Sequence, residues 1–135
     1  MSVIVNNRSE NILAVFLKAC DLFSFSVNTV HNEKYFKKRT FDSLGKPIVN
    51  LAQEIMSDVH YADELDGENE NAHGKRLEIM ERIAARLSAL QANIKVNALK
   101  YHLTADKARE WTIVFEDFKK AFNNWRKTEK TRLLR

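Results

Sequence analysis

The chain has 135 residues, a formal net charge of +4 and 44% hydrophobic residues, which suits one soluble domain. It contains only three glycines and one proline. Because tight turns draw on these residues, their scarcity excludes a protein built from many short strands. The glycines stand apart from one another, which excludes a glycine-rich phosphate loop. The single cysteine, Cys20, excludes an internal disulfide and a cysteine-based zinc site.

The apolar segments predict a cytoplasmic protein that has no membrane partner. The longest uncharged run lies between Asp21 and Glu33 and has 11 residues, too few to span a bilayer. The first residues also lack the basic, apolar and small-residue order of a secretory leader.

Charge is distributed unevenly along the chain. Residues 54–81 hold nine acids and two bases, a sum of −7, so the remainder sums to +11. A basic field of this kind attracts polyanions and steers their approach. The alternative interpretation is that the charge only keeps the protein soluble.

The first apolar segment predicts a helix over about residues 7–31. Its stripe repeats every three or four residues and consists of Ile12, Phe16, Ala19, Phe23, Val27 and Val30. Leu13, Leu17 and Cys20 widen it on one side, and Val15, Leu22 and Phe25 widen it on the other. The result is broader than the roughly 100° stripe of an ordinary surface helix. We therefore expect this helix to be buried on two sides, within a larger core or against another subunit.

Three further segments have the same rhythm and predict helices over about 40–62, 75–102 and 104–127. The last is anchored by the aromatic stripe Trp111, Phe115, Phe118, Phe122 and Trp125. A basic link at 32–39 and an acidic link at 63–74 separate the first three helices, and a basic tail follows at 126–135.

Four helices with these links predict an all-α fold, a single up-down-up-down four-helix bundle spanning residues 1–135. The predicted third helix has a second apolar face of small residues that would let another backbone approach closely. We therefore expect a homo-oligomer. The predicted interface residues are Phe25, Ala85, Ala89, Ala92, Val96 and Leu99.

The histidines, carboxylates and cysteine of the chain do not form the pattern of a catalytic or metal site. None of the four histidines follows a glutamate at the spacing that di-metal bundles use, and the carboxylates gather in one link. Cys20 lies on the apolar face of the first helix, which favours an inert thiol. We expect no catalytic residues, no metal and no cofactor.

The basic residues are better candidates, because cations interleaved with aromatics are typical of single-stranded nucleic-acid binding. Lys34, Lys37, Lys38 and Arg39 surround Tyr35 and Phe36 in the first link. The alternative is that Phe36 closes the end of the core and the lysines are merely solvated.

Two other basic groups leave alternatives open. Arg82 and Arg86, one turn apart, either contact phosphates or pair with Glu78 and Glu81 on the same helix. The basic tail is either a binding arm or a solubilising end. The full set of predicted nucleic-acid or partner-binding residues is Lys34, Lys37, Lys38, Arg39, Arg82, Arg86, Lys95, Lys100, Arg126 and Lys127.

The order of features resembles a four-helix-bundle family. This family includes the accessory variability determinant (Avd) proteins of diversity-generating retroelements, and the proteins encoded in intervening sequences of bacterial 23S ribosomal RNA genes are similar. The matching residues are Asp21-Leu22-Phe23, the run from Arg39 to Gly45 followed by Ile48, then Arg76, Leu103-Thr104 and Trp125. The likeness covers roughly residues 10–127.

The resemblance implies a homopentamer with a basic surface that binds RNA, or RNA paired with DNA, and the reverse transcriptase of the element. The partner enzyme would supply the catalysis of mutagenic cDNA synthesis. The alternative function is a scaffold of the intervening-sequence type that binds only protein.

Overall fold

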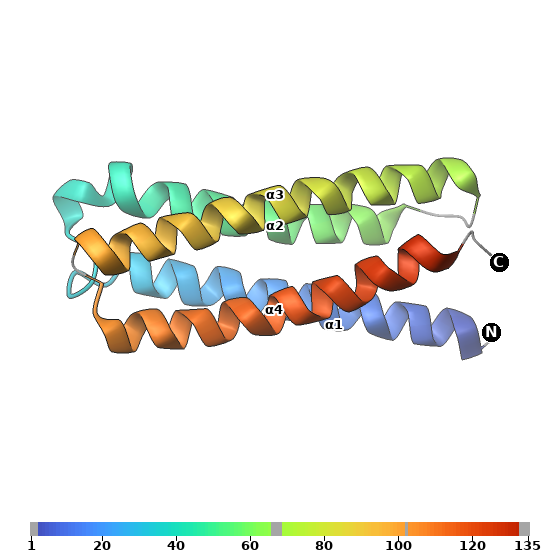
Figure 1. The fold of residues 1–135 in the computed structure, drawn as a ribbon, viewed down its shortest axis with the longest axis horizontal. Helices are drawn as coiled ribbons and strands as arrows, with labels where there is room; N and C mark the ends of the chain where they lie inside the picture. Colours follow the sequence, from blue (N-terminus) through green and yellow to red (C-terminus); the bar gives the residue numbers. More distant parts are fainter. Residues whose placement is uncertain (1–2, 66–68, 102, 133–135) are drawn as a thin grey trace.

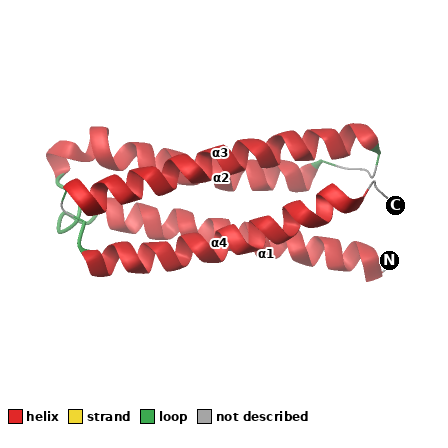
Figure 2. Cartoon of the chain, viewed as in Figure 1, coloured by secondary structure: helices red, strands yellow, loops and turns green. Residues whose placement is uncertain are grey.

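The computed structural model describes residues 3–65, 69–101 and 103–132, with side chains described between 12 and 131 of these ranges. Within them the chain forms four long helices and no strand (Figure 2). They are α1 (Val3–Val30), α2 (Lys46–Glu64), α3 (Glu70–Lys100) and α4 (Ala105–Arg132). Two short helical turns, η1 (Lys38–Thr40) and η2 (Phe41–Gly45), precede α2. The prediction of an all-α chain with four helices is confirmed.

The four helices lie alongside one another in an elongated arrangement (Figure 1). The main contacts of α1 are with α2 and α4, and α3 contacts the same two helices. The start of α1, the end of α2, the start of α3 and the end of α4 lie at one end of the molecule (Figure 1). The segment 31–45, the end of α3 and the start of α4 lie at the other end.

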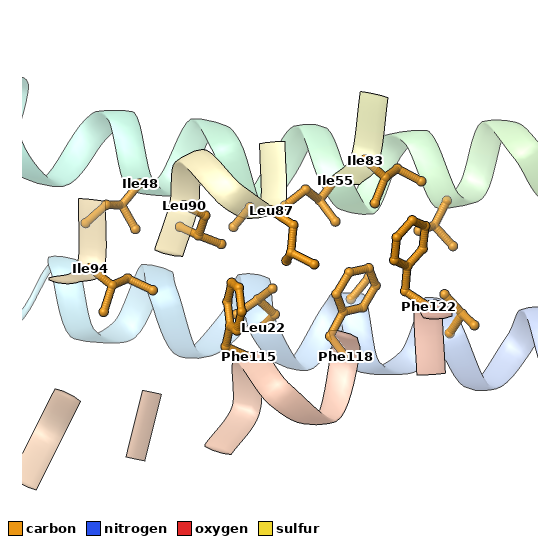
Figure 3. Close-up of a cluster of buried hydrophobic side chains, with 14 of the residues drawn as sticks. Leu22, Ile48, Ile55, Ile83, Leu87, Leu90, Ile94, Phe115, Phe118 and Phe122 are labelled. Atoms are coloured by element: carbon orange, nitrogen blue, oxygen red, sulfur yellow. The ribbon is translucent and has the colours of Figure 1, made fainter. Parts of the chain in front are cut away.

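The core runs along the centre of the four helices. The aromatic stripe predicted for α4 is buried in full. Its residues Phe115, Phe118 and Phe122 project from α4 toward Leu87 and Ile83 of α3 (Figure 3). Burial of several aromatic side chains supplies a large apolar area, so α4 contributes heavily to this core.

The buried face of α1 is rotated from the predicted stripe. Val15 and Leu22 are fully buried, whereas Phe16 and Phe23 are only partly buried. Ser26 also lies on this buried face. Its hydroxyl accepts a hydrogen bond from the indole Nε1 of Trp111 at 3.1 Å. A buried polar group is tolerated when it has such a partner.

Helix α1 is also long and apolar enough over Ile12–Val30 to cross a membrane, judged by length and composition alone. The two charged residues within this stretch, Lys18 and Asp21, are exposed. Core helices of soluble proteins pass the same test, so this single stretch does not assign the chain to a membrane.

The boundaries of α1, α2 and α3 differ from the predicted ones. The sequence predicts the second helix from about residue 40, but the turns η1 and η2 occupy that stretch and α2 begins only at Lys46, and α3 ends at Lys100. Helix α1 begins at Val3 instead of Asn7, and α2 continues to Glu64. Helix α3 begins at Glu70 and not at Lys75, because the Asn69 side chain caps it and accepts a hydrogen bond from the Ala72 amide at 2.8 Å. The acidic link predicted over 63–74 is therefore much shorter, and its residues 66–68 lie outside the described part.

Helix α4 also extends beyond its predicted end. It starts at Ala105 with Thr104 as its cap, whose hydroxyl accepts from the Lys107 amide at 3.2 Å. The prediction of a separate tail after residue 127 is wrong as far as Arg132, since α4 continues to that residue. Glu129 is buried one turn beyond Trp125 and holds this last part of the helix against the bundle.

Candidate nucleic-acid and partner interfaces

The most concentrated group of exposed cations lies on the segment between α1 and α2. Lys37, Lys38 and Arg39 are exposed on the η1 turn. The backbone amide and hydroxyl of Thr40 both donate to the Lys37 carbonyl at 3.0 Å, which closes the turn. None of the three cations forms an ion pair within the described part of the chain. Three adjacent positive charges are therefore presented to solvent on an ordered backbone.

Lys34 and Lys100 complete this group. Lys34 is exposed three residues before Lys37, and Lys100 is exposed at the last residue of α3, which ends on the same side of the molecule (Figure 1). We call the five side chains Lys34, Lys37, Lys38, Arg39 and Lys100 the cationic end.

The two aromatic residues of this segment have different surroundings. Phe36 is buried, and its ring packs edge-on against Trp111 with centroids 6.2 Å apart. Tyr35 is half-buried, with the ammonium groups of Lys34 and Lys107 at 5.6 and 5.4 Å from its ring centroid. Phe36 therefore closes the end of the core, as the alternative interpretation held, and is not exposed for stacking on a base.

A pocket of about 880 Å³ opens beside the cationic end. It is lined by Val30, His31, Asn32, Glu33, Phe36, Lys38, Phe41 and Asp42. The rings of His31 and Phe41 lie 5.0 Å apart in its wall. Acidic, basic and aromatic side chains alternate around it, so its lining is polar as well as apolar.

Close packing at Gly45 places the start of α2 beside this pocket. A methyl group at Gly45 would lie 2.4 Å from Cγ1 of Val30 at the end of α1. Only glycine lets the two helices approach this closely. The π-helical turn η2 ends at the same residue.

Arg82 and Arg86 pair across the interface between α3 and α2. Arg82 lies 2.7 Å from Asp58, and Arg86 contacts both Asp58 and Glu54, the latter at 3.0 Å. The hydrogen bond that Arg82 donates to Asp58, followed by the charge of that carboxylate, raises the pKa of Arg82 above its ordinary value. The partners lie on α2, whereas the sequence suggested Glu78 and Glu81 on α3. Both arginines are thus engaged in holding α2 and α3 together.

A second ionic cluster, buried at the opposite end, was not predicted. The side chain of Glu129 on α4 lies 2.8 Å from Nδ1 of His73 and 2.9 Å from Nε of Arg76, both on α3. A guanidinium hydrogen of Arg76 also bonds to the Leu65 carbonyl at 3.3 Å. This cluster joins the start of α3 to the last turns of α4.

Of the remaining predicted binding residues, Lys95 and Arg126 line a groove between α3 and α4. Lys127 is exposed on α4. These three cations are separate from the cationic end, and the structure does not gather all ten predicted residues into one surface.

The predicted oligomer interface is an exposed face of α3. Ala85 and Ala92 are exposed, Ala89 is partly buried, and Val96 and Leu99 retain 47% and 74% exposure. We call these five residues the outer α3 face. Phe25 lies apart from them on α1, where its ring packs 5.9 Å from Trp111.

Cys20 is a free, partly buried thiol. Burial raises its pKa, and the neighbouring carboxylate of Asp21 adds to the effect. Within the described ranges, no group of three or more histidine, cysteine or acidic side chains could hold a metal ion.

Comparison with known proteins gives no relative: no family model, no curated protein and no solved structure matches this chain. The resemblance to the Avd family therefore rests on the residues quoted above and stays a prediction.

Proposed function

We propose that this protein is a non-catalytic accessory protein that binds RNA, or RNA paired with DNA, through the cationic end. In this proposal it also binds a reverse transcriptase and supports mutagenic cDNA synthesis in a diversity-generating retroelement. The observation that carries the proposal is the row Lys37, Lys38 and Arg39, exposed on an ordered turn and without ion pairs in the described part of the chain.

Unpaired cations on an ordered surface favour polyanion binding for a physical reason. Phosphates that bind them release condensed counterions, and this release drives association. Arg82 and Arg86 are weaker candidates, because contact with a phosphate would compete with their pairing to Asp58 and Glu54. Phosphate binding at Lys37, Lys38 and Arg39 would break no ion pair within the described part of the chain.

The proposal assigns catalysis to the partner polymerase. Its support is the resemblance over the segment Arg39 to Gly45 and around Trp125, together with the basic surplus of the chain. The cationic end would hold the RNA, and a separate surface would hold the enzyme.

We further propose that the chain is an up-down-up-down bundle that assembles into a homo-oligomer, a pentamer by the resemblance. The outer α3 face supports self-association because Val96 and Leu99 expose apolar surface beside small alanines. Contiguous apolar surface of this kind is typical of interaction sites.

RNA binding is tested by fluorescence anisotropy with a labelled single-stranded RNA at low salt. The variant K37Q/K38Q/R39Q removes three charges from the cationic end. The matched control K18Q/K75Q/K120Q removes three charges from exposed positions on α1, α3 and α4 that lie outside the predicted binding set. We expect the first variant to bind at least tenfold more weakly and the control to bind within about threefold of wild type. The reverse pattern, or equal binding by all three proteins, would contradict the assignment.

The second candidate is a scaffold that binds only protein, which the outer α3 face also favours. This candidate differs from the first proposal in one measurable property, since the wild-type protein would show no RNA binding at 50 mM salt. Co-migration of the chain with a purified reverse transcriptase, together with RNA binding, supports the first proposal.

A further inference from the structure

A groove runs along the seam between α3 and α4. Two hollows of about 270 and about 220 Å³ lie on this seam. Gln91 and Phe115 line both of them, so the hollows join into one feature, which we call the α3–α4 groove. It extends from Ala98 and Ala108 to Asn123 and Arg126.

The groove exists because the side chains along the seam are small. Ala98 on α3 lines one hollow together with Ala108 and Thr112 on α4, and Ala84 and Ser88 on α3 line the other. Of the four neighbouring helix pairs, α3 and α4 have the sparsest contact. The floor consists of buried apolar side chains of the core, namely Leu87, Ile94, Phe115 and Phe122.

The charge along the groove is entirely positive. Lys95, Lys119 and Arg126 line it, and no carboxylate does. None of these three cations forms an ion pair with another described residue. Nε of Arg126 is also buried without a hydrogen-bond partner in the described part of the protein. A buried donor left without an acceptor is destabilising, so an acceptor supplied by a ligand would remove this cost.

These features suit a ligand that is both apolar and acidic. An amphipathic helix laid along the seam would place apolar side chains over the floor and carboxylates beside the three cations. A nucleic-acid backbone would satisfy the cations but would not fill the apolar hollow that Ala98 and Ala108 line. The lining therefore favours a protein ligand over RNA.

We propose that the α3–α4 groove docks an acidic amphipathic helix of a partner protein. This inference rests on the proposed function in so far as that function includes a protein partner. It assigns the partner to a surface separate from the cationic end, so that RNA and protein bind together.

The test uses a labelled synthetic amphipathic peptide of about five helical turns, with leucines on one face and glutamates flanking them. A matched peptide carries glutamine at each glutamate. We expect the acidic peptide to bind and the glutamine peptide to bind at least tenfold more weakly. Binding of both peptides with equal affinity, or of neither, would overturn the proposal.

Two variants locate the binding site. K119Q/R126Q removes two of the three groove cations, and K75Q/K120Q removes the same charge from exposed positions of α3 and α4 outside the groove. We expect the acidic peptide to bind K119Q/R126Q at least tenfold more weakly, and K75Q/K120Q within twofold of wild type. Equal effects would show non-specific attraction and overturn the proposal. Ser88→Trp, a substitution at an exposed position of the groove wall, fills the hollow without a charge change and should also abolish binding.

Two further measurements separate this inference from the proposed function. RNA binding should persist in S88W, and peptide binding should persist in K37Q/K38Q/R39Q. RNA binding without any peptide binding overturns the groove proposal alone. A lower assembly mass for S88W in light scattering would show that a second copy of this chain occupies the groove, which also overturns it.

Discussion

The guanidinium of Arg76 on α3 lies 2.9 Å from the carboxylate of Glu129 on α4. Their side chains retain 1% and 2% exposure, and His73 approaches the same carboxylate at 2.8 Å. The pair links two residues that are distant in sequence, at the end of the molecule where α3 begins and α4 ends. It explains why α4 continues past Trp125 as a helix.

Removing one partner of this pair should be costly. Glu129→Gln keeps the shape of the side chain but leaves the buried Arg76 charge with a neutral amide. Loss of one member of a buried ion pair typically costs about 3–5 kcal/mol, and we expect a lower free energy of unfolding by about that amount in urea denaturation. The double variant R76M/E129L should lose less than E129Q alone. A fully stable E129Q protein would contradict the structural role of the pair.

Both residues lie at positions that continue the apolar stripes of their helices. Arg76 lies at stripe spacing before Ile79 and Ile83, and Glu129 lies one turn after Trp125. Their charge argues against burial when each helix is considered alone. Only the approach of α3 to α4 shows that each supplies the other's partner, so the sequence pattern placed Glu129 in a solvated tail.

The glycine at the start of α2 should be intolerant of a side chain. Gly45→Ala would place a methyl group 2.4 Å from Val30, which is itself buried. Such overpacking typically costs about 1–3 kcal/mol.

Gly74 gives the matched control for Gly45. It lies within α3, and a methyl group there meets nothing within 4 Å. Gly74→Ala should therefore stabilise the protein by about 0.5–1 kcal/mol. Thermal or urea unfolding of both variants measures the contrast, and two effects of the same sign would count against the packing at Gly45.

The thiol of Cys20 should react slowly at neutral pH. Burial and Asp21 raise its pKa above the ordinary value, so at any pH near that value the folded protein holds less thiolate than a free cysteine does. Since the thiolate is the reactive form, the pH midpoint of alkylation should lie above that of the urea-unfolded chain. Asp21→Asn should lower the midpoint part of the way. A midpoint equal to that of the unfolded chain would contradict the expectation.

The outer α3 face should determine the assembly state. Light scattering of wild-type protein should give a multiple of the 15.7 kDa chain mass. Ala92→Glu places a charge at the centre of this face and should dissociate the assembly, because an unpaired charge buried in an interface is costly.

Ile113→Glu is the control for Ala92→Glu, since Ile113 is an exposed apolar residue on α4. It should leave the assembly mass unchanged. A wild-type mass of one chain at micromolar concentration would reject the proposed oligomer.

The parts of the fold that depend on one helix at a time were predictable. The aromatic period of α4 indicates its buried face, and Thr104 marks its start. Features that depend on how two helices pack against each other could not be predicted from the sequence. The buried face of α1 includes Ser26, whose hydroxyl accepts a hydrogen bond from Trp111, a residue 85 positions away.

The candidate surfaces show the same division. The exposed cations Lys37 to Arg39 were predicted from their run in sequence, and their exposure follows from a short turn. The α3–α4 groove requires Lys95 and Arg126 to line one seam together with Lys119. The spacing of residues within α3 or within α4 does not indicate this groove, because the groove forms where small residues of the two helices meet.

The salt dependence of RNA binding tests the central claim most directly. For single-stranded RNA, log K falls with log salt by about 0.7 per phosphate contact. If the cationic end holds the RNA, K37Q/K38Q/R39Q should flatten this slope by about 2 relative to wild type, while K18Q/K75Q/K120Q leaves it unchanged. An unchanged slope for the first variant, or binding that does not weaken between 50 and 300 mM salt, would contradict the claim.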